Sequence, residues 1–201
     1  MKVGVIGCGT MGSGIAQVAS TSNWEVVLYD LNEAALAKSK ATLAKVMDRL
    51  VEKGRQTEAS SAAIQQRIAY STDLTELKSS DFVIEAIVEN LEIKHKLFQS
   101  LESIVSSDCI IASNTSSLSI TSLAACLKKP ERFVGVHFFN PAPLMKLVEI
   151  IPAVQTSNEI LEKTKTTIDS WKKVTVKVKD TPGFIVNKVA RPFYSEAIKM
   201  Y

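Results

Sequence analysis

The sequence predicts an α/β fold in which helices pack on both faces of a mostly parallel, doubly wound sheet. Short apolar runs alternate with segments whose apolar residues recur at helical spacing, which is the pattern of strands connected by helices. The chain also begins with one such strand, which leads directly into a glycine-rich turn and a helical segment. This strand–turn–helix order is the context that makes a glycine motif informative.

The first turn predicts a dinucleotide site. Val3, Val5 and Ile6 form a short apolar run that suits a buried strand. The motif G-x-G-x-x-G follows, in which the first glycine permits a tight turn, the second a close approach of pyrophosphate, and the third close packing of helix on strand. Free amides at the helix start would hold the phosphates, and a glycine-rich loop without a ligand is the alternative. The residues of this turn are Gly7, Gly9, Thr10, Met11 and Gly12.

Asp30 predicts which dinucleotide binds. It ends the second predicted strand, residues 25–29, at about the twenty-residue spacing of an acid that accepts hydrogen bonds from an adenosine ribose. A carboxylate there repels a 2′-phosphate, and the next residues, Leu31 and Asn32, include no arginine to accept one. NAD is therefore favoured over NADP. The alternative is that Asp30 caps the following helix.

The remaining elements follow from periodicity and from turn residues. Asn32 can cap a long helix that Gly54 ends, and we expect Ile93, Leu97, Leu101 and Ile104 to form the inner face of a later helix. Thr156 and Glu159 offer a capping box for a helix that reaches about Trp171. Further helices are predicted over residues 58–68, 91–104, 118–127 and 184–201, and further strands over residues 68–70, 81–86, 109–112, 132–137, 147–151 and 174–178.

Polar residues follow several predicted strands, at the point where each strand ends. They are the glycine turn, Asp30, Glu89 with Asn90, residues 114–116 and residues 137–140. Ligands of doubly wound sheets bind outside the carboxyl ends of the strands. If the strands are parallel, these groups meet at one edge, and that convergence predicts a site more strongly than any single motif.

His137 and Glu149 are the candidate acid–base pair of this site. Histidine accepts a proton near neutral pH, and a buried acid partner would raise its basicity and fix its tautomer. Glu149 is the single carboxylate in an apolar strand, and buried carboxylates are rare unless paired. The alternative is a core histidine and a solvent-facing glutamate. The other histidine, His95, lies on a charged helix face where we expect it to be solvated.

Composition and missing motifs exclude several other functions. The chain has 201 residues with a net charge of +3, which gives no case for nucleic acid as a partner. Three cysteines without metal spacing indicate a reduced, cytoplasmic setting, and no signal peptide or membrane-length apolar run is evident. Two histidines without a second ligand cluster argue against catalytic zinc, so we expect no metal. No G-x-S-x-G surrounds Ser116, although Ser116 and Asn114 could donate hydrogen bonds to a substrate oxygen.

Five stretches together resemble the NAD-binding domain of the L-3-hydroxyacyl-CoA dehydrogenase family, in the family's order. They are GCGTMGSG at residues 7–14, EAIVEN at 85–90, SNTSS at 113–117, HFFNP at 137–141 and DTPGFIVN at 180–187. The resemblance implies a Rossmann-like fold and oxidation of the C3 hydroxyl of an L-3-hydroxyacyl-CoA, with hydride passing to NAD, as in fatty-acid or aromatic-acid catabolism. The partner is then the acyl-CoA substrate, and its chain length stays open.

The resemblance also implies a role for each site residue. His137 is the general base, Glu149 orients it, and Ser116 and Asn187 hydrogen-bond the substrate oxygens. The glycine turn and Asp30 bind NAD, and four further residues lie near it: Glu89, Lys94, Asn114 and Asn140. The long helical pair between the second and third strands resembles the family's arm that touches coenzyme A, with Lys53 as the expected phosphate contact.

Two domains are expected, residues 1–183 as the NAD-binding domain and residues 184–201 as the start of a helical dimerisation domain. The family normally continues past Asn187, so we interpret the chain as a fragment or a natural short form, with NAD binding retained and turnover impaired. The full-length enzyme is expected to be a homodimer. Two alternatives are a noncatalytic dinucleotide-binding module and a 3-hydroxyacid dehydrogenase that uses a catalytic lysine.

Overall fold

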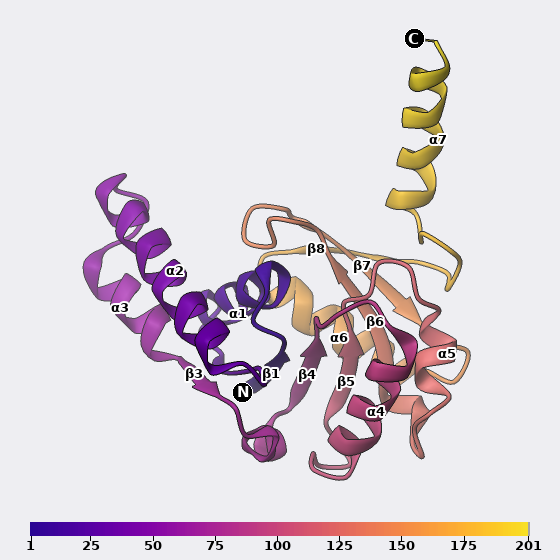
Figure 1. Ribbon diagram of the computed structural model, residues 1–201. Coiled ribbons are helices and arrows are strands. Elements are labelled where there is room, and N and C mark those ends of the chain that lie inside the picture. Colours follow the sequence, from indigo (N-terminus) through magenta and orange to yellow (C-terminus); the bar gives the residue numbers. More distant parts are fainter. Residues whose placement is uncertain (201) are drawn as a thin grey trace.

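The computed structural model describes residues 1–200, and it confirms a doubly wound α/β fold (Figure 1). Eight strands form a single sheet in the order β3-β2-β1-β4-β5-β6-β7-β8. The strands are β1 (Lys2–Ile6), β2 (Glu25–Tyr29), β3 (Ile68–Ser71), β4 (Phe82–Glu85), β5 (Ile110–Ser113), β6 (Phe133–Phe138), β7 (Leu147–Pro152) and β8 (Val174–Lys177).

The first six strands of this order (β3, β2, β1, β4, β5 and β6) run parallel. Strand β7 runs antiparallel to β6. The antiparallel pairing places His137 directly opposite Glu149. All residues of β4, β5 and β6 are buried, because helices cover both faces of the sheet at these strands. The near-continuous apolar runs in the sequence are the result of this two-sided burial.

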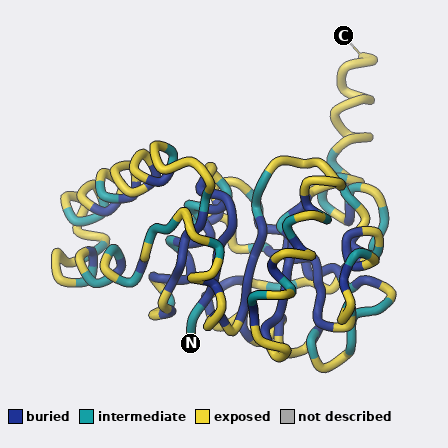
Figure 2. The backbone as a smooth tube through the Cα atoms, turned by 60° about the horizontal axis from the view of Figure 1, so that its bottom comes forward, coloured by how far each residue is buried: buried dark blue, intermediate teal, exposed yellow. Residues whose placement is uncertain are grey.

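Two apolar clusters lie on opposite faces of the sheet. One contains side chains of α1, α2, α3 and α6, and the other contains side chains of α4 and α5. Figure 2 shows the buried strands in the middle of the molecule and exposed outer helix faces. The helices are α1 (Thr10–Thr21), α2 (Glu33–Glu52), α3 (Glu58–Gln66), α4 (Leu91–Glu102), α5 (Ile120–Ala124), α6 (Asn158–Ser170) and α7 (Val186–Lys199), with short 3₁₀ turns at Leu74–Ser79 and Pro130–Arg132.

The α2–α3 pair forms an arm beside the sheet (Figure 1). Side chains cap both helices: Asn32 accepts a hydrogen bond from the Ala35 amide, and Thr57 accepts one from the Ser60 amide. Leu36, Leu43 and Met47 form the buried stripe of α2. The rest of α2 is largely exposed, so the arm keeps a free surface next to the C-terminal ends of the strands.

Helix α7 projects away from the sheet (Figures 1 and 2). Each of its residues, Val186–Lys199, is at least partly exposed, although Val189, Phe193 and Ile198 are large apolar side chains. Pro192 lies inside the helix, as the sequence indicated. Tyr201, the last residue of the predicted helix, lies outside the described residues.

The inner face of α4 differs from the sequence-based expectation. Phe98 and Leu101 are fully buried, but Ile93 is 46% exposed and Lys94 is 1% exposed in its place. The ammonium of Lys94 pairs with Glu85 at the end of β4. Lys94 therefore takes the buried position on the helix that the apolar spacing predicted for Ile93. His95 is partly exposed, and its Nε2 lies 2.9 Å from the Ser122 carbonyl oxygen.

Two other local expectations were wrong. The α6 N-cap is Ser157, whose hydroxyl accepts from the Ile160 amide, whereas the Thr156 hydroxyl donates to the Phe133 carbonyl in the adjacent strand. Helix α5 is shorter than the predicted range 118–127 at both ends: Ser119 caps its start by accepting from the Ser122 amide, and the helix ends at Ala124. For Thr156, a contact with another strand takes up a side chain that sequence rules assign to a local cap.

Phe98→Ala should destabilise the protein by about 3–5 kcal/mol, since it removes a fully buried ring that packs edge to face on Phe133, with ring centroids 4.9 Å apart. Ile93→Ala, one turn earlier on the exposed side, should change the free energy of unfolding by less than about 1 kcal/mol. Urea denaturation of both variants measures the two effects. Equal losses would contradict the observed helix face.

Candidate active site

The turn after β1 is shaped by its glycines. Gly7 has φ +97°, and a Cβ at Gly12 would lie 1.7 Å from the Gly7 carbonyl oxygen, so neither position accepts another residue without movement. A Cβ at Gly9 would meet nothing within 4 Å. Gly9 is also the N-cap of α1, and no side chain caps that helix start. The turn therefore offers open space and free amides, which is the environment a pyrophosphate requires.

Asp30 lies beside this turn, at the end of β2. Its carboxylate accepts hydrogen bonds from the Cys8 amide at 2.9 Å and the Asn32 amide at 3.0 Å. Burial alone would raise the pKa of Asp30, but these backbone hydrogen bonds hold it below its ordinary value, so the group is ionised. The cap of α2 is Asn32, so Asp30 remains available to a ligand.

The end of β6 and the middle of β7 hold the His137–Glu149 pair. Nδ1 of His137 lies 2.8 Å from Oε2 of Glu149, and the two residues are 5% and 1% exposed. The other carboxylate oxygen accepts from the amides of Ile185 and Val186, at the start of α7. An acceptor at Nδ1 places the proton there and leaves Nε2 as the basic nitrogen. The contact therefore fixes the orientation of the imidazole ring within the pair.

The loop after β5 is held by Glu89. Oε1 of Glu89 accepts from the amides of Ser116 and Ser117 and from the Thr115 and Ser117 hydroxyls. Burial would raise the pKa of Glu89, but these hydrogen bonds and the Lys94 charge lower it. Asn114 turns away from this loop and accepts a hydrogen bond from the Phe138 amide, which joins the ends of β5 and β6.

The remaining predicted residues are dispersed around this edge. Asn187 lies in the first turn of α7, adjacent to the amides that Glu149 binds. Asn140 is exposed just beyond β6, and Ser116 is exposed in the β5 loop. Lys53 is the C-cap of α2 and is exposed, at the far end of the arm from the glycine turn.

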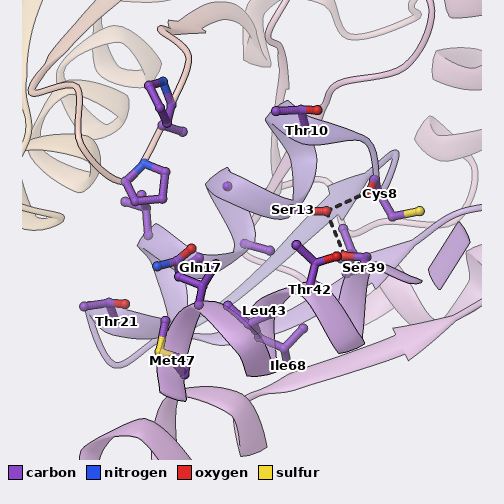
Figure 3. Close-up of a pocket in the computed structure, with 18 of the residues that line it drawn as sticks. Cys8, Thr10, Ser13, Gln17, Thr21, Ser39, Thr42, Leu43, Met47 and Ile68 are labelled. Atoms are coloured by element: carbon purple, nitrogen blue, oxygen red, sulfur yellow. Dashed lines mark hydrogen bonds between the residues drawn. The ribbon is translucent and has the colours of Figure 1, made fainter. Parts of the chain in front are cut away.

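A cavity of about 1090 Å³ opens beside the turn, along α1. Figure 3 shows its two sides: Ser13, Gln17 and Thr21 of α1 face Leu43 and Met47 of α2. The segment from Asn140 to Lys146 forms a further wall. Four lysines line the cavity (Lys38, Lys146, Lys172 and Lys173), against a single carboxylate, Asp30. The groove thus combines apolar walls with a net positive charge.

Sequence reasoning missed Lys173. Its ammonium donates to the Ala142 and Met145 carbonyls, at 2.5 and 2.8 Å, and holds the wall segment in place. Burial lowers the pKa of this lysine. Lys173 follows another lysine in an ordinary turn, so nothing in the local sequence marks it.

Within residues 1–200, no group of three or more His, Cys, Asp or Glu side chains is arranged to hold a metal ion. No helix of that part has the length and apolar character needed to cross a membrane.

Fold and site together define a nicotinamide-dinucleotide-binding dehydrogenase domain. Residues 2–181 match the family model described as 3-hydroxyacyl-CoA dehydrogenase, NAD binding domain. The chain belongs to the 3-hydroxyacyl-CoA dehydrogenase family, and its cofactor is NAD.

Individual relatives agree with this assignment. The chain is 44% identical to a probable 3-hydroxybutyryl-CoA dehydrogenase of Deinococcus radiodurans, covering 99% of this chain and 71% of the relative. It is also 44% identical to the 3-hydroxyadipyl-CoA dehydrogenase of Escherichia coli K12, covering 97% of this chain and 41% of that protein. A crystal structure of (S)-3-hydroxybutyryl-CoA dehydrogenase from Ralstonia eutropha superposes with a TM-score of 0.95 at 44% identity, covering 98% and 69% of the two chains.

Gly9→Ala and Gly12→Ala should separate ligand binding from folding. Alanine at Gly12 collides with backbone and should cost about 1–3 kcal/mol of stability. Alanine at Gly9 meets no protein atom and should leave stability unchanged, but its methyl enters the space expected for pyrophosphate and should weaken NAD binding by about tenfold. Thermal unfolding and NAD titration measure the two effects. Unchanged NAD affinity in the Gly9 variant would contradict this placement.

Proposed function

We propose that the protein oxidises the C3 hydroxyl of an L-3-hydroxyacyl-CoA, with His137 as the general base. The observation that carries the proposal is the buried contact between His137 Nδ1 and Glu149, which leaves Nε2 free to take the hydroxyl proton. Glu149 orients the ring and stabilises the imidazolium as it forms. When bound, NAD supplies the hydride acceptor.

Substrate positioning is assigned to Ser116 and Asn187. Ser116 is exposed in the loop after β5, and its backbone amide donates to Glu89. This bond fixes the backbone from which the Ser116 hydroxyl extends. Asn187 sits one residue after Val186, whose amide is fixed by Glu149. Both side chains can donate a hydrogen bond to a substrate oxygen. In the reverse reaction, reduction of the ketone, such a bond stabilises the negative charge that develops on the carbonyl oxygen.

The dinucleotide is assigned to the glycine turn and its neighbours. The open position at Gly9 and the free amides of α1 fit the pyrophosphate, and the ionised Asp30 fits an adenosine ribose. Thr10 and Met11 belong to the same turn. The other half of the cofactor is assigned to Glu89, Lys94, Asn114 and Asn140.

Coenzyme A is assigned to the groove along α1 and α2. Its apolar walls suit the pantetheine arm, and its lysines suit phosphates. Lys53, at the C-terminal end of α2, is the assigned contact to a CoA phosphate. The chain length of the acyl group is not fixed by these residues.

Residues 1–183 are assigned to the NAD-binding domain and residues 184–201 to the start of a helical domain. The apolar side chains exposed on α7, including Val189, Phe193 and Ile198, support this assignment because they need a covering partner. We assign pairing of two chains to that domain. The free thiols Cys8, Cys109 and Cys126 fit a reducing compartment such as the cytoplasm.

His137→Gln should reduce turnover by about 10²–10⁴-fold, because glutamine occupies a similar space but cannot accept the proton. The Kd for NAD should stay within about twofold of its value in the unaltered protein, because His137 is not part of the glycine turn to which NAD is assigned. Acetoacetyl-CoA reduction by NADH and NAD titration test the two statements. A noncatalytic dinucleotide-binding module would show no difference between the variant and the unaltered protein in either assay.

Lys53→Ala should weaken binding of free CoA by about threefold, the effect of one exposed cation on a phosphate. Lys163→Ala is the matched control, because Lys163 is likewise an exposed lysine but belongs to α6 and not to the α2–α3 arm. Calorimetric titration with CoA gives both affinities. Equal affinities in the two variants would remove Lys53 from the site.

A further inference from the structure

Strand order fixes where the second half of a bound dinucleotide must lie. The glycine turn follows β1, and Asp30 follows β2 on one side of it. Because β4 and β5 lie on the other side of β1, a cofactor with its pyrophosphate at the turn and its adenosine at Asp30 extends its nicotinamide over the ends of β4 and β5. This step rests on the proposed function.

A charged cluster occupies that end of the sheet. The ammonium of Lys94, on α4, pairs with Oε1 of Glu85 at the end of β4 and lies 3.3 Å from Oε2 of Glu89. Glu85 is fully buried and Lys94 is 1% exposed, whereas the side chain of Glu89 is 36% exposed at the mouth of the site. The Lys94–Glu85 pair is therefore little screened by salt, whereas Glu89 meets solvent at its exposed side.

The hydrogen bonds define the charge of each member. Glu85 only accepts: Oε1 takes hydrogen bonds from Lys94 and from the Ile87 amide at 2.7 Å, and Oε2 takes one from the Ser113 hydroxyl at 2.7 Å. All of these contacts suit a carboxylate, whose two oxygens only accept. Glu89 is likewise an acceptor at both oxygens. Two carboxylates and one ammonium leave the cluster with a net charge of −1.

We propose that the Glu85–Lys94–Glu89 cluster sets the preference of the site for oxidised over reduced cofactor. The nicotinamide ring of NAD⁺ carries a positive charge, and the ring of NADH carries none. A net negative cluster at the strand ends where this ring would lie would stabilise NAD⁺ relative to NADH. Glu85, which no part of the acid–base chemistry uses, is a positioning and charge-setting residue in this arrangement.

Glu85→Gln tests the proposal, because glutamine keeps the shape and removes the charge. Dissociation constants for NAD⁺ and NADH are measured separately, by calorimetry and by NADH fluorescence. The ratio Kd(NAD⁺)/Kd(NADH) should rise by about three- to tenfold. This is the effect of one charge at about 10 Å and an effective dielectric constant of about 20, after a reduction for screening. A purely structural defect would weaken both cofactors and leave the ratio unchanged.

Two further variants control for damage. Glu85→Gln combined with Lys94→Met restores the net charge of −1, so the ratio should return toward its original value even though stability falls further. Glu102→Gln is the matched control: this half-buried carboxylate accepts from the Lys128 and Lys129 amides and pairs with Arg132 at the other end of α4. It should leave the ratio unchanged.

The outcomes separate this proposal from the proposed function. If the unaltered protein binds neither cofactor, both are overturned. If it binds both and Glu85→Gln leaves the ratio unchanged, the proposed function stands and the role of the cluster is overturned. If thermal unfolding shows that Glu85→Gln does not fold, Glu89→Gln takes its place, because it also removes one negative charge from the cluster, at a partly exposed position. An unchanged ratio in Glu89→Gln would then overturn the proposal.

Discussion

The candidate active site depends on one buried carboxylate. Glu149 binds His137 through one oxygen and the first amides of α7 through the other. The same side chain therefore fixes the tautomer of the base and the start of the helix that carries Asn187. An ionised carboxylate at 1% exposure would be costly without these partners, so the helix start and the histidine stabilise the charge that orients them.

The sheet explains why such partners meet. Parallel strands β1, β2, β4, β5 and β6 all end at the same edge, so each contributes a loop there. Three carboxyl side chains at this edge have a hydrogen-bond partner from another element: Asp30 from the β1 turn, Glu89 from the β5 loop and Glu149 from β6. The loops are thereby tied to one another through charges rather than through apolar packing.

Much of this edge could be predicted from sequence. The glycine turn, Asp30 and the single carboxylate Glu149 in an apolar strand are local signals, because each breaks an otherwise regular pattern. The burial of Lys94 and Lys173 could not be predicted. Both are buried lysines whose partners lie on other elements, the carboxylate of Glu85 and the carbonyls of the wall segment, and helical periodicity assigns such residues to solvent. The same limit misplaced the inner face of α4.

The groove wall and the His137–Glu149 pair both depend on residues that lie late in the sequence. Residues 142–145 are anchored by Lys173, and Glu149 receives its last partners from residues 185 and 186. The ribosome therefore synthesises the glycine turn and the central strands long before the residues that give the groove wall and the His137–Glu149 pair their last contacts. These contacts can form only when Lys173 and the start of α7 have been synthesised.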